Sequence, residues 1–87
     1  MDEKKLIGRR IKELRKSKGL SQEKLAEKAE TSPNYLSRME RGTENPTLDM
    51  LIKLSTALEV EMWEMFDFGH VASQKELKQA IQDFSRT

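Results

Sequence analysis

Apolar residues recur at helical spacing along the chain of 87 residues, and no stretch shows the strict alternation of a β-strand. This spacing predicts an all-α protein built from short helices. Gly19 and Gly42 each follow a helical pattern and are expected to end the first and third helices. The predicted helices cover residues 3–18, 21–29, 32–41, 48–58 and a short segment at 61–66.

The starts of these helices carry N-terminal signals. Ser21, Ser32 and Thr47 stand at N-cap positions, where a side-chain oxygen accepts a hydrogen bond from the first turn. Pro33 follows at a first helical position, where a missing N–H costs nothing. The second and third helices are therefore separated by a tight turn, and Glu30 occupies it.

The later helices contain most of the large apolar residues. The helix at 48–58 has an apolar side made of Leu48, Leu51, Ile52, Leu54 and Leu58. The segment "EMWEMF" is predicted to complete the core with Met62, Trp63, Met65 and Phe66.

A separate amphipathic helix is predicted after Gly69, at about residues 73–84. Ser73 and Glu76 form a capping box in front of an apolar stripe. We therefore divide the chain into a domain of residues 1–69 and a C-terminal helix within 70–87. The stripe must be buried, either against its own domain or in a two-fold interface with a second copy. It consists of Leu77, Ala80, Ile81 and Phe84.

Charge is unevenly distributed, although the net charge is only +1. Residues 1–20 carry eight basic and three acidic residues, which gives +5, whereas residues 43–69 carry one lysine and six acids, which gives −5. A basic end favours a polyanionic partner. A solvated charged helix face would produce the same distribution, so charge alone does not choose between the two.

No constellation of an enzyme is visible. The chain has no cysteine, which excludes disulfides, cysteine zinc sites and thiol catalysis. The one histidine, His70, follows Gly69 and is expected to be a linker residue. The acids at 59, 61, 64 and 67 lack the spacing of a metal-binding loop. We expect no catalytic residue, no metal, no cofactor and no small-molecule substrate.

No apolar run approaches the roughly 20 residues that a membrane-spanning helix needs. The N-terminal segment "MDEKKLIGRR" also lacks the apolar centre of a signal peptide. We therefore expect no membrane association and a cytoplasmic, nucleoid-associated protein.

The helix at 32–41 has two unlike faces when residues are placed about 100° apart. One face is expected to pack on the core and carries Tyr35, Leu36 and Met39, whereas the other carries Asn34, Ser37, Arg38 and Arg41. Asn and Arg can bind the edges of adenine and guanine at two points, and each such pair discriminates by roughly 1–3 kcal/mol. The pattern favours base reading, and a polar face without a ligand is the alternative.

The sequence also resembles a known family. The phrases "LRKSKGLSQEKLAEKA", "YLSRMERG", "NPTLDMLIKLSTAL" and "EMWEMF" have the order and spacing of the Cro-type, lambda-repressor-like helix-turn-helix domain of the Xre family. The resemblance covers about residues 6 to 66. It implies a five-helix DNA-binding domain with its helix-turn-helix motif at 21–42 and a third helix that enters the major groove.

The resemblance also implies roles for single residues. Base-reading positions map to Ser32, Pro33, Asn34, Ser37 and Arg38. Contacts with the DNA backbone map to Gln22, Tyr35, Thr43 and Asn45, and Arg41 on the outer face joins this group. Arg9 and Arg10 are further phosphate candidates because they lie in the basic end. A structural ion pair maps to Arg15 and Glu40.

Three residues depart from the family pattern. Glu30 stands where the turn often has glycine, and a left-handed conformation there would cost of order 1–2 kcal/mol. Pro33 offers only an apolar contact, such as one with a thymine methyl group. Glu44 brings a negative charge into a loop that meets phosphate, and we expect it to point away or to weaken binding.

The resulting hypothesis is a transcriptional regulator that binds double-stranded DNA as a homodimer. Phosphate contacts would supply much of the affinity and the third helix the sequence preference. One rival is a protein-interaction module or the antitoxin of a toxin pair, favoured by the acidic segment 43–69 and the C-terminal helix. The other is an enzyme accessory or catalytic domain, which the missing site chemistry disfavours.

Overall fold

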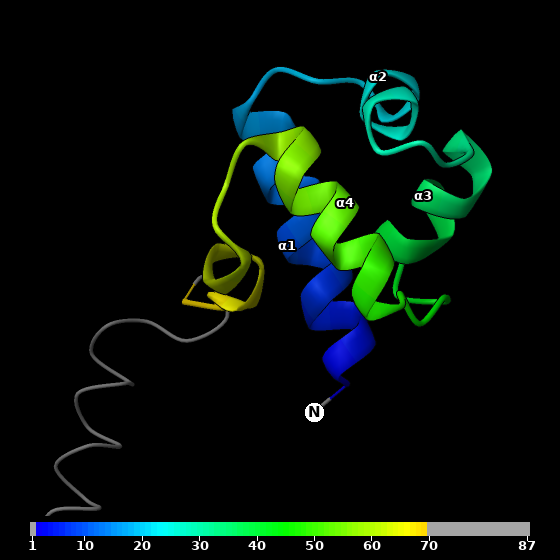
Figure 1. Ribbon diagram of the computed structural model, residues 1–87. Coiled ribbons are helices and arrows are strands. Elements are labelled where there is room, and N and C mark those ends of the chain that lie inside the picture. The colour runs from blue at the N-terminus through cyan, green and yellow to red at the C-terminus, as the bar shows by residue number, and fades with distance from the viewer. Residues whose placement is uncertain (1, 70–87) are drawn as a thin grey trace, which may run out of the picture.

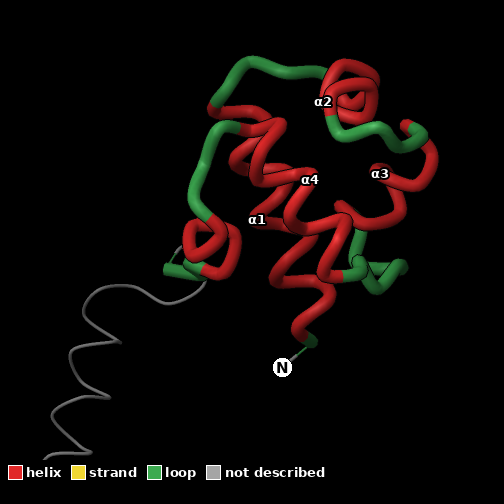
Figure 2. Tube along the Cα trace, in the orientation of Figure 1, coloured by secondary structure: helices red, strands yellow, loops and turns green. Residues whose placement is uncertain are grey.

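The computed structural model describes residues 2–69, and these residues form helices joined by short connections (Figures 1 and 2). No strand occurs within this range, so the predicted all-α class is confirmed. The elements in chain order are α1 (Glu3–Ser17), α2 (Gln22–Lys28), α3 (Pro33–Glu40), α4 (Leu48–Leu58) and the 3₁₀ helix η1 (Met62–Phe66).

The short helix predicted at 61–66 corresponds to η1. It has five residues and adopts 3₁₀ geometry rather than α geometry. The helix predicted at 73–84, with its apolar stripe, lies outside the described residues and stays a prediction.

Packing joins every element to at least two others. Helix α3 contacts both α1 and α2, while α4 contacts α2 and η1, and η1 also contacts α1. In the view of Figure 1, α2 and α3 lie together on the right and η1 lies on the left. The fully buried large side chains come from all five elements: Ile11, Leu25, Leu36, Met39, Leu54, Leu58 and Met65.

The three N-caps predicted within residues 2–69 form. The side-chain oxygens of Ser21, Ser32 and Thr47 accept hydrogen bonds from backbone N–H groups in the first turns of α2, α3 and α4. Pro33 occupies the first turn of α3, where its missing N–H has no helical partner to lose.

Gly8 sets the approach of α1 to α3. A Cβ atom at this buried position would overlap the carbonyl oxygen of Met39 and come within 2.9 Å of the carbonyl oxygen of Glu40. Any side chain would therefore push the end of α3 away from α1. The apolar pattern gave no sign of this backbone contact, because a glycine inside a helix looks only like a weak position.

The four α-helices all end with the same closure. The residue after the last helical turn takes a positive φ, and the next N–H bonds a carbonyl five residues earlier. The positive-φ residues are Gly19, Glu30, Gly42 and Glu59. The corresponding bonds run from Leu20 to Arg15, from Thr31 to Ala26, from Thr43 to Arg38 and from Val60 to Ser55.

Part of the predicted core is exposed. Trp63 and Phe66 are 66% and 44% exposed, so the expectation that they complete the core was wrong. In a 3₁₀ helix, residues three apart lie above one another. Met62 and Met65 therefore share the inner side of η1, which leaves the outer side to Trp63 and Phe66.

Two residues of α4 are also more exposed than the sequence predicted. Leu48 and Ile52 are 66% and 46% exposed, although both were expected on the buried side. They stand four residues apart and share one face of the helix. The buried face is formed by Leu51, Leu54, Ser55 and Leu58.

The left-handed turn yields a stability prediction. Glu30 has a φ of 56°, as anticipated for this turn. Relief of left-handed strain is worth roughly 1–2 kcal/mol, whereas the extra chain entropy of glycine costs roughly 0.5–1 kcal/mol. Glu30→Gly should therefore raise the free energy of unfolding by about 1 kcal/mol in urea denaturation.

Glu30→Ala is the matched control, because it removes the same charged side chain and keeps the Cβ atom. It should give no comparable gain. A glycine variant that is no more stable than the alanine variant would contradict the strain at this turn.

Candidate nucleic-acid interface

A buried ion pair fixes the position of α3. The guanidinium of Arg15 in α1 donates from Nε to Glu40 Oε2 at 2.7 Å and from Nη2 to Glu40 Oε1 at 3.0 Å. Both residues are only 8% exposed. The two parallel hydrogen bonds allow no sliding between the helices, so the pair sets both the distance and the register of α3 against α1.

The pair also includes the start of α2. Arg15 Nη1 donates to the carbonyl oxygen of Leu20 at 2.8 Å, in the connection between α1 and α2. Gln22 Nε2 donates to Glu40 Oε1 at 3.1 Å. An amide nitrogen carries two hydrogens, so this bond leaves Gln22 a second donor hydrogen. The predicted phosphate-contacting residue is thus oriented by the ion pair.

The inner side of α3 is anchored in the core, as its face pattern predicted. Leu36 and Met39 are 0% and 1% exposed, and Tyr35 packs against the core while remaining partly accessible. Ser32 Oγ accepts a hydrogen bond from the backbone N–H of Tyr35 at 3.0 Å, which closes the first turn. These contacts leave the helix no freedom to turn its polar face inward.

The outer side of α3 carries the candidate base-reading residues. Ser32, Pro33 and Asn34 are exposed, and Ser37 and Arg38 are half-buried. The helix start therefore presents short side chains, and the longer guanidinium groups of Arg38 and Arg41 lie nearer its end.

Arg41 is exposed at the end of α3 and donates from Nη1 to Ser37 Oγ at 2.8 Å. This bond lies along the outer face and joins a candidate phosphate contact to a candidate base contact. The two side chains thus form one polar unit.

Arg38 lies between an aromatic ring and a carboxylate. Its guanidinium carbon is 5.7 Å from the centre of the Tyr35 ring, and its Nε is 3.5 Å from Glu44 Oε2. Of the two alternatives expected for Glu44, pointing away from this site is wrong, and weakening of DNA binding stays a prediction. The closure of α3 at Gly42 turns the chain back, which brings Glu44 beside the last turns of the helix.

The loop after α3 presents the remaining candidates. Thr43 and Asn45 are exposed, and Thr43 Oγ1 donates to the carbonyl oxygen of Arg38 at 3.1 Å. The loop is thus attached to α3 and lies next to its outer face.

The two arginines of the basic end have different surroundings. Arg9 is exposed on α1. Arg10 donates from Nε to the carbonyl oxygen of Glu64 at 2.7 Å and forms an ion pair with Glu13. Arg10 therefore connects α1 to η1, and its predicted phosphate contact stays a prediction.

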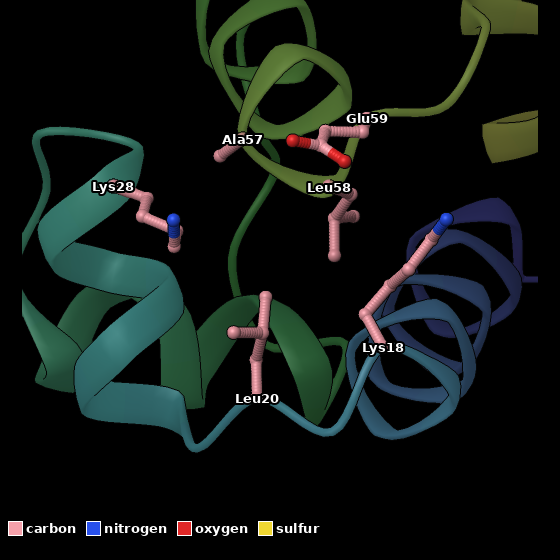
Figure 3. Close-up of a pocket in the computed structure, with 6 residues that line it drawn as sticks. All are labelled: Lys18, Leu20, Lys28, Ala57, Leu58 and Glu59. Carbon is pink, nitrogen blue, oxygen red and sulfur yellow. The ribbon is translucent and has the colours of Figure 1, made fainter.

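The described residues also enclose a small cavity of about 150 Å³ (Figure 3). The ends of α1, α2 and α4 surround it, and none of the candidate site residues lines it. Its lining consists of Lys18, Leu20, Lys28, Ala57, Leu58 and Glu59.

In residues 2–69 no helix is long and apolar enough to cross a membrane. The same part of the chain holds no group of three or more His, Cys, Asp or Glu side chains placed to share a metal ion.

Two short helices at a tight turn, with an anchored inner face and a polar outer face on the second, define a helix-turn-helix protein. A model of the helix-turn-helix family HTH_3 matches residues 11–62. The chain therefore belongs to this family, which confirms the resemblance seen in the sequence.

Named relatives agree with this assignment. The HTH-type transcriptional regulator SinR of Bacillus subtilis (strain 168) is 44% identical over 66 residues, which is 75% of this chain and 60% of SinR. The control protein C.BamHI of Bacillus amyloliquefaciens is 38% identical over 74 residues, 84% of this chain and 91% of that protein. This chain thus spans 60% of SinR but almost all of C.BamHI.

A solved structure shows the same fold. The restriction-modification controller protein C.AhdI from Aeromonas hydrophila superposes with a TM-score of 0.73 at 40% identity, covering 75% of this chain and 98% of that chain.

The ion pair yields a second stability prediction. Arg15→Met leaves the Glu40 carboxylate buried without its guanidinium, and removal of one partner of such a pair typically costs roughly 3–5 kcal/mol. We expect a loss of that size in the free energy of unfolding, measured by urea denaturation. The double variant Arg15→Met/Glu40→Leu should be more stable than Arg15→Met, because no buried charge remains.

An exposed ion pair contributes only about 0–1 kcal/mol, so a loss below about 1 kcal/mol for Arg15→Met would fall in that range. That result would show that the pair does not hold α3 in place.

Proposed function

We propose that this chain is a sequence-specific DNA-binding transcriptional regulator that inserts α3 into the major groove. The observation that carries the proposal is the geometry of α3, a helix held by Leu36, Met39 and the Arg15–Glu40 pair with its polar face outward. A helix of this width fits the major groove, where each base pair shows a distinct pattern of donors and acceptors. The named relatives are themselves transcriptional regulators and control proteins.

Within this proposal the site residues divide into two groups. The outer face of α3 reads bases through Ser32, Pro33, Asn34, Ser37 and Arg38. Contacts with the sugar-phosphate backbone come from Arg9, Gln22, Tyr35, Arg41, Thr43 and Asn45. Backbone contacts set the register on the duplex, and base contacts supply the preference.

We also propose that the chain acts as a homodimer in the cytoplasm, associated with the nucleoid. Two copies of α3 about one helical turn apart (~34 Å) would bind two half-sites and double the contact set. The candidate interface is the stripe of the predicted C-terminal helix.

A protein-interaction role is the second candidate. The observation that favours it is the set of large exposed apolar side chains in the described residues: Leu48, Ile52, Trp63 and Phe66. An antitoxin-type component would use such a surface to hold a protein partner, and DNA binding would then be secondary.

The first test of DNA binding uses random duplex fragments at several salt concentrations. Wild-type affinity should fall linearly in a plot of log K against log salt concentration, because phosphate contacts release counterions. Arg38→Ala should lose preference at one base pair of the selected site, by a factor equivalent to roughly 1–3 kcal/mol. Gln22→Ala is the comparison variant and should weaken binding equally for all sequences.

Absence of duplex binding by the wild type at low salt would reject the proposed function and favour the protein-interaction role. An unchanged selected-site profile for Arg38→Ala would reject base reading by that residue alone.

The homodimer has its own test in sedimentation velocity. Leu77→Asp/Ile81→Asp places two charges on the predicted stripe and should convert dimers into monomers. Gln79→Asp/Gln82→Asp adds the same two charges to the opposite side of the predicted helix and should leave the dimer intact. A dimer that persists in the first variant would place the interface elsewhere.

A further inference from the structure

Resting on the proposed function, we propose that Glu44 is a specificity-determining residue: it positions the Arg38 guanidinium for a base edge and withholds it from the phosphates. Glu44 does this through Arg38 and touches no base itself.

The end of α3 fixes the location of Glu44. Gly42 has a φ of +78°, and its N–H bonds the carbonyl oxygen of Met39. Both the backbone N–H and the Oγ1 of Thr43 donate to the carbonyl oxygen of Arg38, at 3.0 and 3.1 Å. Thr43 is thus held to the backbone of Arg38 by two hydrogen bonds. Glu44 follows it directly, so the backbone at Glu44 is fixed close to the Arg38 side chain.

The surroundings of Arg38 constrain its guanidinium at two places. Glu44 Oε2 lies 3.5 Å from Nε, and the ring of Tyr35 lies 5.7 Å below the guanidinium carbon. Of the five N–H donors of arginine, one is on Nε and four are on the two terminal nitrogens. The carboxylate lies beside Nε, so the four donors on the terminal nitrogens are left for another acceptor. Two such donors match the two acceptors of guanine.

The Arg38–Glu44 ion pair contributes too little to the free energy of folding to have a mainly stabilising role. The side chains of Arg38 and Glu44 are 39% and 38% exposed. Ion pairs with this exposure change folding stability by only about 0–1 kcal/mol. A contact of that strength is too weak to matter for the fold, but it is sufficient to bias the orientation of a side chain with several rotatable bonds.

Glu44 also has a cost for binding, because its negative charge lies in a loop beside a polyanion. Without this charge, the released Arg38 side chain can reach a neighbouring phosphate, which is a contact without sequence information. The carboxylate thus lowers affinity for every sequence and raises the difference between sequences.

The test compares the wild type, Glu44→Gln, Arg38→Ala and the double variant on the selected site and its single-base variants. Glu44→Gln keeps the size of the side chain and removes its charge. It should bind arbitrary duplexes more tightly. Its preference at the base pair that Arg38→Ala affects, measured as the ratio of affinities for the selected base and the alternatives, should fall roughly tenfold. Its plot of log K against log salt should steepen by about 0.9, the value for one added phosphate contact.

At that base pair the double variant should lose no more preference than Arg38→Ala alone, because Glu44 acts only through Arg38. Glu59→Gln is the matched control: it removes one exposed negative charge at the far end of α4 and should leave the preference unchanged.

Three results would overturn the proposal. A Glu44→Gln variant with tighter binding and an unchanged preference would show simple repulsion from phosphate. Loss of preference at another base pair, additive with Arg38→Ala, would show that Glu44 contacts a base directly. A wild type that binds no duplex at any salt concentration would remove the proposed function itself, a result distinct from the other two.

Discussion

The bidentate ion pair between Arg15 and Glu40 is the interaction on which the rest of the structure depends. It joins α1 to α3 directly, and the bonds of Arg15 with Leu20 and of Gln22 with Glu40 include the α1–α2 connection and the start of α2. A small domain has few buried side chains, so one directional contact among three helices defines their arrangement more sharply than apolar packing alone. Gly8 allows this contact, because the backbones of α1 and α3 approach closely at that position.

Within residues 2–69 the sequence was sufficient to predict the four α-helices and their ends, and it failed where tertiary packing decides burial. N-caps and helix ends are local features, so Ser32, Pro33 and Gly42 marked α3 from the sequence. Burial depends on neighbours that are distant in the chain. A helical pattern alone therefore could not show that α4 buries the side with Leu54 and exposes Ile52. The burial of Trp63 and Phe66 was also mispredicted, because the 3₁₀ geometry of η1 changes which residues share a face.

The candidate site shows the same division. The anchored and outer faces of α3 follow from spacing along one helix and were predictable. The contact of Arg10 with the carbonyl oxygen of Glu64 joins residues 54 positions apart in the chain, so no local pattern indicated it. The contact between Arg38 and Glu44 was within reach of a local argument. The helix end at Gly42 reverses the chain, and a residue placed two positions beyond it lies beside the last turns.

The pairing of arginines bears on how such a protein would discriminate between sequences. Sequence-independent affinity grows with the number of cations that meet phosphate. In this chain the net charge is only +1, and Arg10, Arg15 and Arg38 each have a carboxylate partner. Paired cations contribute less to non-specific binding, so the ratio of specific to non-specific affinity depends more on base contacts. In a genome most DNA sites are non-specific and compete for the regulator. Occupancy of its own site therefore depends more on the ratio of specific to non-specific affinity than on tight binding to any duplex.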